Sequence, residues 1–501
     1  MPATALYTAA QTRALDRCAS EEHGLPGIVL MKRAGAGALA ELRRRWPAAR
    51  TLTVLCGGGN NGGDGYIVAA LARQRGLSAR VVALADPQGL AGDAALAYHF
   101  AVAAGVPVAP WDGAAALDGD VLVDALLGTG ITRPVTGAYA EAIAALNAAP
   151  APVLAIDIPS GLHADTGAEL GVAVRAAATV TFIGRKLGLY TGRGPACAGD
   201  LVFNSLEVPA AVYAQVAAAA ELLDLAGLVG LLPARARDAH KGQFGHLMVI
   251  GGDRGFGGAA LLAAEAAART GAGLVSVATH PEHAASFLAR RPELMVKGVP
   301  SGQELEPLLA APSVLVVGPG LGRSPWAEQM LQQALAAERP MVLDADALNL
   351  LAGGRFGREF AGRRWVLTPH PGEAARLLSV DNAGIQRDRP GACRQLQHRF
   401  GGAVLLKGAG TLIADPEGRL GVCPYGNPGM ASGGMGDVLS GVIGALLAQG
   451  LDPGSAARLG ACLHGRAADL AAAADGERGL LATDLPDRIR KLLNGCHGAD
   501  H

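Results

Sequence analysis

The segment GNPGMASGGMGDVLSGVIGALLAQG, residues 426–450, decides the fold of the second half of the chain. Gly433, Gly434 and Gly436 lead directly into an apolar helical stretch, and Asp437 falls in its first turn. Backbone N–H groups of such a loop, together with the helix dipole, bind anions. A carboxylate beside bound phosphate can take a proton from an attacking hydroxyl, which predicts phosphoryl transfer. The structural alternative is that Asp437 caps the helix and the glycines allow close packing.

Other strand ends in the same half carry residues that suit a nucleotide. The segments GGDRGFGGAA (251–260) and VGPGLG (317–322) are two further Gly-rich turns between a strand and a helix. LTPHPGE places His370 between prolines at a strand end, where a capped loop histidine is the alternative interpretation. LLKGAGT places Lys407 at another strand end beside glycines, a position that suits nucleotide phosphate or ribose.

Strand-like and helix-like stretches alternate through both halves of the chain. The expected strands are 51–56, 80–84, 121–127, 153–157 and 179–182, then 246–250, 274–279, 314–318, 341–346, 365–369 and 403–408. Helical patterns lie between them, one of them starting at about residue 66. This alternation predicts parallel sheets with helices on both faces, and so two tandem three-layer α/β domains.

The boundary between the domains is expected near residue 222. The Ala-rich segment 210–232 is the most apolar long stretch, but it contains Gln215, Glu221 and Asp224. Charges at that spacing fit a surface helix followed by a linker better than a membrane span. The sequence therefore predicts domains at 1–222 and 223–501.

Composition excludes several classes of protein. Only 17% of the 501 residues are charged, half are hydrophobic, and the formal net charge is −1. These values argue against a disordered chain, and no basic patch indicates nucleic acid or an anionic membrane as partner. The seven cysteines, Cys496 among them, are scattered without metal-site spacing, and no secretory signal precedes the first strand. We therefore expect a soluble cytoplasmic enzyme with reduced thiols.

Polar residues in the first half also gather at strand ends. CGGGNNGGDGY (56–66) packs Asn60, Asn61 and Asp64 among glycines, which indicates either a ligand site or a tight strand–helix connection. VDALLGTGITRP (123–134) and AIDIPSG (155–161) place further acidic, hydroxyl and glycine residues after two other strands. Because the carboxyl ends of parallel strands meet at one edge of the sheet, we expect these loops to form one crevice.

The motifs carry a resemblance to known families. The first half resembles the NAD(P)H-hydrate epimerase family through YTAAQTRALDR, GLPGIVLMKRAG, GGGNNGGDGY, VDALLGTGI, AIDIPSG and TFIGRKLGLYTGRG. In the second half GMGD resembles the ribokinase-like superfamily. The wider set GGDRGFGGA, DADALNLL, LTPHPGE, KGAGT and GNPGMASGGMGDVLSG resembles the ADP-dependent NAD(P)H-hydrate dehydratase family. The resemblance implies a Rossmann-like sheet in the first domain and a ribokinase-like second domain.

For the first domain the resemblance implies a site for a hydrated nicotinamide dinucleotide and a potassium ion. The ion would lie against the oxygen donors of Asn61, Asp124 and Ser160. Asp157 would bind substrate at the reacting ring as the acid/base residue. Lys186 would either meet substrate phosphate or be a solvated surface lysine. The implied substrate contacts are Asn60, Asn61, Gly62, Gly63, Asp64, Gly128, Thr129, Gly130, Ile131, Thr132, Arg133 and Pro134.

For the second domain the resemblance implies a catalytic Asp437 and two groups of ligand contacts. The adenine nucleotide would meet Lys407, Gly408, Ala409, Gly410, Thr411 and Gly436. The hydrated dinucleotide would meet Ala260, Gly320, His370 and Asp437.

The implied activity is repair of hydrated nicotinamide cofactors. The first domain would interconvert the epimers of NADHX and NADPHX. The second would dehydrate the S epimer with Mg²⁺ and ADP, giving AMP and phosphate, with Asp437 as base on the substrate hydroxyl. A homo-oligomer is also expected. The alternative function is a ribokinase-like kinase of a vitamin or its precursor, carrying a non-catalytic N-terminal binding module.

Overall fold

The computed structural model describes residues 4–113, 117–357, 360 and 362–495. The chain divides into two compact units, residues 1–221 and 222–501. Within the described residues, no helix has the length and apolar character needed to cross a membrane. Each unit has its own sheet and its own hydrophobic core.

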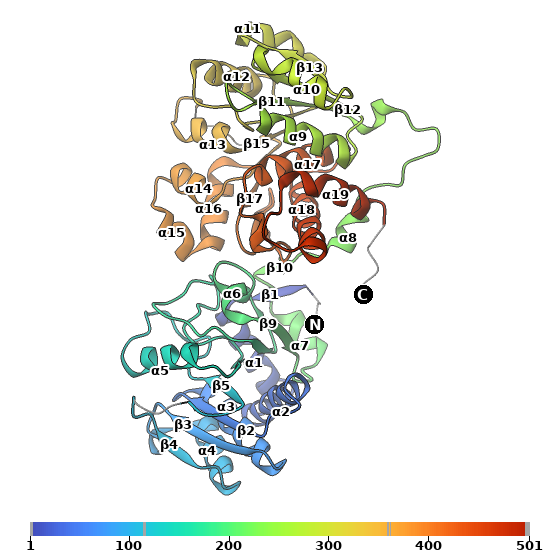
Figure 1. The fold of residues 1–501 in the computed structure, drawn as a ribbon. Helices are drawn as coiled ribbons and strands as arrows, with labels where there is room; N and C mark the ends of the chain where they lie inside the picture. Colours follow the sequence, from blue (N-terminus) through green and yellow to red (C-terminus); the bar gives the residue numbers. More distant parts are fainter. Residues whose placement is uncertain (1–3, 114–116, 358–359, 361, 496–501) are drawn as a thin grey trace. The chain divides into compact units, whose positions relative to one another are not determined.

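Unit 1 is built on a seven-stranded sheet whose paired strands are all parallel. The strands are β2 (Thr51–Cys56), β3 (Ser78–Ala83), β4 (Val108–Pro110), β5 (Val121–Ala125), β6 (Val153–Ile156), β7 (Ala178–Phe182) and β9 (Asp200–Asn204). Their order across the sheet is β4-β3-β2-β5-β6-β7-β9 (Figure 1). Side chains alternate between the faces of the sheet, so that Leu52, Val54 and Cys56 join one core and Leu55 joins another.

Helices cover both faces of this sheet. On one face lie α2 (Gly27–Arg45), α3 (Asn60–Gln74) and α4 (Gly92–Ala103), and on the other lies α5 (Gly137–Ala148). The remaining elements are β1 (Ala5–Tyr7), α1 (Ala9–Glu21), β8 (Arg185–Lys186), α6 (Gly194–Ala198), α7 (Ala210–Gln215) and β10 (Ala220–Leu222). The predicted three-layer parallel fold of the first domain is confirmed.

The sheet of unit 2 repeats this plan and extends it. Its order is β13-β12-β11-β14-β15-β16-β17-β18-β19, parallel as far as β17 and antiparallel from β17 to β19. The strands are β11 (His246–Ile250), β12 (Leu274–Thr279), β13 (Met295–Gly298), β14 (Val314–Val317), β15 (Met341–Leu343), β16 (Trp365–Leu367), β17 (Ala403–Leu406), β18 (Thr411–Ala414) and β19 (Leu420–Cys423).

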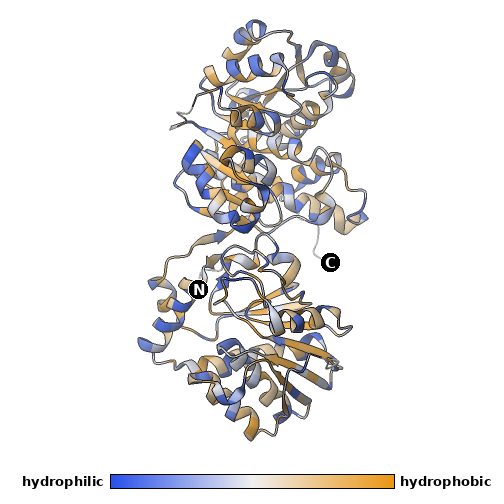
Figure 2. Cartoon of the chain, turned by 90° about the vertical axis from the view of Figure 1, so that its left-hand side faces the viewer, coloured by the Kyte–Doolittle hydropathy of each residue, from blue (hydrophilic) through white to orange (hydrophobic). Residues whose placement is uncertain are grey.

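Helices flank this second sheet as well (Figure 1). One face is covered by α9 (Gly257–Thr270), α17 (Met435–Ala448), α18 (Pro453–Asp475) and α19 (Leu485–Leu493), which share one apolar core with the strands. The others are α8 (Leu225–Val229), α10 (Ala284–Arg290), α11 (Gly302–Leu305), α12 (Pro325–Ala336), α13 (Ala345–Ala352), α14 (Pro371–Leu378), α15 (Asn382–Arg387) and α16 (Arg389–Phe400). Figure 2 shows the strands of each unit as the most hydrophobic elements, with hydrophilic residues concentrated on the helices and loops.

The order of the strands indicates where a ligand can bind at the edge of each parallel sheet. Counted along the chain within each parallel sheet, both units run 3-2-1-4-5-6-7. In such a sheet the loops after the first and fourth strands diverge to opposite faces, and ligands bind in the crevice between them. In unit 1 those loops follow β2 and β5, and they carry the Asn/Asp-rich and Gly-Thr-Gly segments of the sequence.

Two expectations about helices were wrong. Helix α3 begins at Asn60 and not near residue 66, so the NNGGD segment is the start of a helix and not a loop. The segment 210–232 is not one surface helix followed by a linker, because β10 interrupts it between α7 and α8. Backbone pairing explains this strand, since Ala220 lies opposite Leu6 of β1 and Leu223 N donates to Val422 O over 2.9 Å.

Six of the seven cysteines lie within the described residues. Cys18, Cys56, Cys197, Cys393, Cys423 and Cys462 are buried and form no disulfide. Cys496 lies outside the described residues.

Candidate functional site

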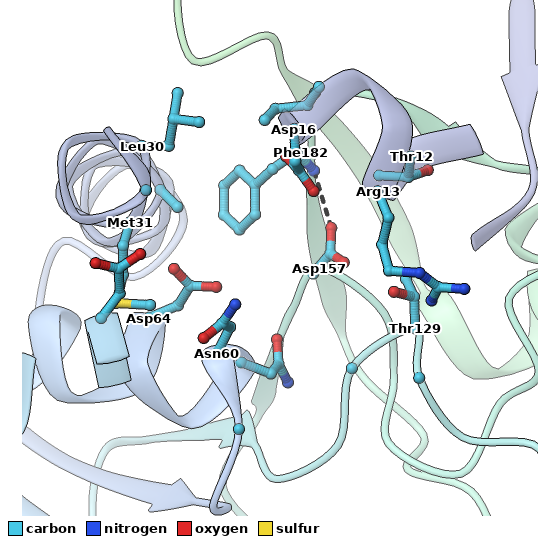
Figure 3. Close-up of a pocket in the computed structure, with 18 of the residues that line it drawn as sticks. Thr12, Arg13, Asp16, Leu30, Met31, Asn60, Asp64, Thr129, Asp157 and Phe182 are labelled. Atoms are coloured by element: carbon cyan, nitrogen blue, oxygen red, sulfur yellow. Dashed lines mark hydrogen bonds between the residues drawn. The ribbon is translucent and has the colours of Figure 1, made fainter. Parts of the chain in front are cut away.

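A cavity of about 650 Å³ opens in unit 1 at the carboxyl ends of β2 and β5. The predicted substrate contacts that line it are Asn60, Asn61, Asp64, Gly128, Thr129, Gly130, Ile131 and Asp157 (Figure 3). Gly62, Gly63, Thr132, Arg133 and Pro134 are not among the described residues that line this cavity. The three expected segments therefore do meet, although not every residue in them faces the space.

Close packing explains the glycines of α3 that do not face the cavity. A Cβ on Gly62 would lie 2.0 Å from Gly57 O, and one on Gly65 would lie 2.5 Å from the Ala125 side chain. A Cβ on Gly63 would lie 2.6 Å from Met31. Glycine normally weakens a helix, but here it lets the first turns of α3 approach the strand ends closely. Asn60, Asn61 and Asp64 are carried to the cavity wall by this approach.

The predicted potassium ligands lie beside the cavity. Ser160 donates to Asp124 from both Oγ (2.6 Å) and the backbone N (2.8 Å), and the Asp124 carboxylate is fully buried. Burial raises the pKa of Asp124 to about 6 despite these hydrogen bonds. Asn61 Oδ1 and Nδ2 are buried without a hydrogen-bond partner, an arrangement that costs free energy unless a further ligand is present. The oxygen donors fit a hard cation.

Asp157 is held at the end of β6 in a strained conformation, with φ 66°. Its Oδ1 accepts a hydrogen bond from Phe182 N (3.1 Å) and forms an ion pair with Lys186 Nζ. Lys186 is 1% exposed and also donates to Phe182 O over 2.9 Å, so the surface-lysine interpretation was wrong. Lys186 therefore contacts Asp157, the candidate acid/base residue.

Sequence reasoning missed the contribution of α1. Thr12, Arg13, Asp16, Arg17 and Ser20 recur with helical spacing and line the cavity from one face of this helix. Burial raises the pKa of Asp16 to about 6, with Lys186 lowering it and Asp157 raising it. The signal was available in YTAAQTRALDR, where Thr12 and Asp16, and Arg13 and Arg17, lie four positions apart and so share one face of a helix.

In unit 2 the Gly-rich segment places α17 against the strand ends. Gly434 is the N-cap residue, with φ 90° in the left-handed region that glycine adopts without strain. A Cβ on Gly436 would lie 3.3 Å from Lys407 Nζ and 3.6 Å from Asp344 Oδ2. Glycine at this position lets the first turn of the helix approach the charged residues after β15 and β17.

Those charged residues form a cluster around Lys407. Lys407 Nζ lies 2.9 Å from Asp344 Oδ1, and Ser440 Oγ donates to Asp344 Oδ2 over 2.6 Å. Burial alone would raise the pKa of Asp344, but Lys407 and the hydrogen bonds lower it. Glu373 Oε2 lies 3.9 Å from Lys407 Nζ, and burial raises the pKa of Glu373 to about 7. Sequence analysis assigned no role to Asp344, Glu373 or Ser440.

Asp437 lies in the first turn of α17 and does not cap it, because Gly434 is the N-cap and no side-chain cap is present. The structural alternative for Asp437 is therefore wrong. Burial raises the pKa of Asp437 to about 7, repulsion by Asp344 adds to this, and Lys407 opposes it. A carboxylate that titrates near neutral pH is well matched to general base catalysis.

The other predicted ligand contacts of the second domain lie in several different elements of its fold. His370 caps α14, its Nδ1 accepting from Gly372 N over 3.0 Å, so the capping interpretation is correct. Desolvation lowers the pKa of His370, with Lys407 adding to the effect. Gly320 adopts φ 58° beside Phe256 O, and Ala260 is fully buried in α9. The segment Gly408, Ala409, Gly410 and Thr411 connects β17 to β18. Their ligand roles stay predictions.

Comparison with known proteins identifies the family. Residues 247–491 match the family described as NAD(P)H-hydrate dehydratase, and residues 27–188 match the one described as YjeF-related protein N-terminus. A bifunctional NAD(P)H-hydrate repair enzyme of Coxiella burnetii is 50% identical over 98% of this chain and 100% of its own. The chain belongs to the family of bifunctional NAD(P)H-hydrate repair enzymes.

Other members of the NAD(P)H-hydrate repair family agree. The Escherichia coli enzyme is 44% identical over 99% of this chain and 95% of its own. A ribokinase-like superfamily protein of Enterococcus faecalis, a solved structure, is 31% identical over 55% of this chain and 95% of its own, with a TM-score of 0.50. The predicted ribokinase-like fold is confirmed. These relatives support the repair interpretation and not the vitamin-kinase alternative.

Proposed function

We propose that this chain repairs NADHX and NADPHX, with epimerisation in residues 1–222 and dehydration of the S epimer in residues 223–501. The observation that carries the proposal is Asp437: a carboxylate with a pKa of about 7, in the first turn of a helix beside Lys407 and Asp344. The whole-length relatives named for this repair activity support it.

In the second unit, the bond to be broken holds a hydroxyl to the hydrated nicotinamide ring. Hydroxide is a poor leaving group, so Asp437 removes the hydroxyl proton while that oxygen attacks the β-phosphate of ADP. AMP leaves, and the ring nitrogen lone pair then expels phosphate to give a C=N⁺ bond. Loss of a proton from the neighbouring ring carbon to water forms the ring C=C bond, and the electron pair returns to the nitrogen. The α17 N-terminus and Lys407 face the anionic groups, which is the electrostatic contribution that phosphoryl transfer needs.

In the first unit, the cavity holds the ring of the same substrate against Asp157, which acts as the acid/base residue at the hydroxyl-bearing carbon. Lys186 fixes the carboxylate through Oδ1, so that Oδ2 is available to substrate. Asn60, Asp64 and the segment 128–131 line the space that the dinucleotide would fill.

Two metal ions belong to this proposal. Potassium would be held by Asn61, Asp124 and Ser160, whose donors are oxygens and include the unpartnered Asn61 amide. Mg²⁺ would arrive on the phosphates of ADP, with Asp344 and Glu373 as the neighbouring carboxylates. In each case the ion neutralises charge and orients the groups around it.

The test uses NADH hydrated beforehand to a mixture of epimers. The protein is added with Mg²⁺, with and without ADP, and recovery of the near-ultraviolet absorbance of the dihydropyridine is followed. We expect ADP-dependent recovery that runs to completion, with AMP and phosphate formed in step. Recovery that stops at the share of one epimer would remove the epimerase half of the proposal. No recovery with ADP or ATP would contradict the whole proposal.

A further inference from the structure

The cavity of unit 1 contains a second carboxyl group that faces the space from another element. Asp64 comes from the second turn of α3, whereas Asp157 comes from the end of β6. Figure 3 shows the two carboxyl groups on either side of the Phe182 ring, both turned toward the cavity. Two carboxyl groups from different elements therefore line the space that a substrate ring would enter.

The surroundings of Asp157 favour an acceptor. Its Oδ1 is occupied by the Lys186 ammonium and by Phe182 N, with Thr181 Oγ1 at 3.4 Å. Oδ2 has no such partner among the described residues, and it is the atom free to accept a proton in the cavity.

The surroundings of Asp64 favour the protonated acid. Its carboxyl group receives no hydrogen bond from any described residue and has no ion-pair partner. Burial raises the pKa of Asp64 well above the usual range for an aspartate, and repulsion by Asp157 and Asp16 raises it further. Lys186, which forms the ion pair with Asp157, acts in the opposite direction. When the environments of two carboxyl groups differ in this way, their acid and base roles separate.

We propose that Asp64 is the second catalytic residue of the epimerase, acting as general acid on one face of the substrate ring while Asp157 acts as base on the other. The inference rests on the proposed function and deepens it, because it names the group that handles each proton. A one-sided site would instead require the same carboxylate to serve both faces.

The chemical step balances with water as the only co-reactant. Asp64 gives its proton to the ring hydroxyl, the C–O bond breaks, and the ring nitrogen lone pair forms a C=N⁺ bond as water leaves. Water then adds to the opposite face of that carbon, and its proton passes to Asp157 Oδ2. The C–O bond forms again and the electron pair returns to the nitrogen. The proton moves back from Asp157 to Asp64 through solvent, and the reverse sequence converts the other epimer.

Several charged groups face Asp64 and set its behaviour with pH. They are Asp157 after β6, Asp16 on α1 and Lys186 on β8, and the buried Cys56 thiol of β2 also interacts with Asp64. Of these only Lys186 is positive, and it belongs to the Asp157 ion pair. Epimerisation is therefore expected to fall on the alkaline side, where Asp64 loses the proton that the hydroxyl must receive.

The experiment measures epimerisation alone, by chromatography of the purified R epimer of hydrated NADH without ADP. We compare the full-length protein with Asp64→Asn, Asp64→Glu and Glu21→Gln, an exposed carboxyl group on α1. Asp64→Asn is expected to slow epimerisation about 10²-fold or more, a typical contribution of general acid catalysis, and to lose the alkaline limb. Asp64→Glu should restore part of the rate, and Glu21→Gln should match the unaltered protein.

Two further measurements separate a chemical role from a structural one. Because a neutral amide replaces a neutral acid, Asp64→Asn is expected to keep the thermal unfolding temperature of unit 1 and its dehydration of the S epimer with ADP. In H₂¹⁸O, each inversion is expected to introduce one labelled oxygen. An Asp64→Asn protein within about threefold of the unaltered rate, or inversion with the original oxygen retained, would overturn the two-face mechanism. Absence of epimerisation by the unaltered protein would instead remove the proposed function on which it rests.

Discussion

The two units use the same parts at their sites. In each, a lysine at a strand end forms an ion pair with an aspartate that follows another strand. In unit 1 the pair is Lys186 and Asp157, and in unit 2 it is Lys407 and Asp344. Each site also has a second carboxyl group in the opening turns of a Gly-rich helix, Asp64 in one and Asp437 in the other.

The difference lies in the charges that surround the second carboxyl group. Burial raises the pKa of Asp437 to about 7, Asp344 adds to this and Lys407 opposes it. Burial raises the pKa of Asp64 well above the usual range, Asp157 and Asp16 both add to this, and Lys186 opposes it. In our proposal, the same kind of residue on the same kind of helix acts as a base in one unit and as an acid in the other, and the surrounding charges distinguish the two roles.

The largest expected effect comes from removing the base. Asp437→Asn should reduce ADP-dependent dehydration about 10³-fold, because the amide cannot take the hydroxyl proton. Nucleotide binding should remain, since Lys407 and the α17 N-terminus are unchanged. The measurement is the rate of NADH recovery from the S epimer, with ADP binding by calorimetry as the control. A fully active variant would contradict the assignment of Asp437.

The strands of both units could largely be predicted from the sequence. The expected strands 51–56, 246–250 and 274–279 coincide with β2, β11 and β12. Others end earlier than expected: Asp157, Asp344 and Lys407 directly follow the last residues of β6, β15 and β17. Hydrophobic runs report where a chain is buried, but they do not report where a backbone such as that of Asp157, with φ 66°, turns away from its sheet.

The long-range pairs could not be predicted in the same way. Lys186 and Asp157 lie 29 positions apart, and Lys407 and Asp344 lie 63 apart, so no local pattern connects them. The spacing of polar residues could place Asp16 on one face of α1, but not beside Asp157, which follows β6, and Lys186 of β8. Most of the acidic site residues could be identified because they follow predicted strands. Their ion-pair partners could be identified only from the three-dimensional fold.

The second prediction breaks the pair in unit 1. Lys186→Met should destabilise unit 1 by about 3 kcal/mol, because it leaves the largely buried Asp157 carboxylate without its cation. The measurement is hydrogen–deuterium exchange of β2 and β5 in the full-length protein. The double variant Lys186→Met/Asp157→Asn, which removes both charges, should recover most of this loss. If it does not, packing of the lysine stem and not the ion pair holds this region.

The third prediction concerns the stability cost of Asp16. Its pKa rises from 3.8 to about 6 on folding, so the folded protein keeps this proton after the unfolded chain has released it. Protonation of Asp16 therefore contributes to the free energy of unfolding. This contribution is complete below pH 3.8 and is lost as pH rises through 6, and it amounts to about 3 kcal/mol at most. Asp16→Asn should therefore be more stable than the unaltered protein at pH 8, by about 2 kcal/mol, and nearly equal to it at pH 3.5. The measurement is exchange in β2 and β5 at the two pH values, and an equal difference at both would refute it.

The smallest effect tests the comparison itself, through the pH dependence of the two reactions in one protein. Dehydration needs Asp437 ionised, so its rate should fall about tenfold for each pH unit below 7 and level off above. Epimerisation needs Asp64 protonated, so it should keep its rate through this range and fall only at higher pH. If the rates of both reactions changed with pH in the same way, Asp437 and Asp64 would have to act in the same protonation state. The surrounding charges would then not have separated their roles.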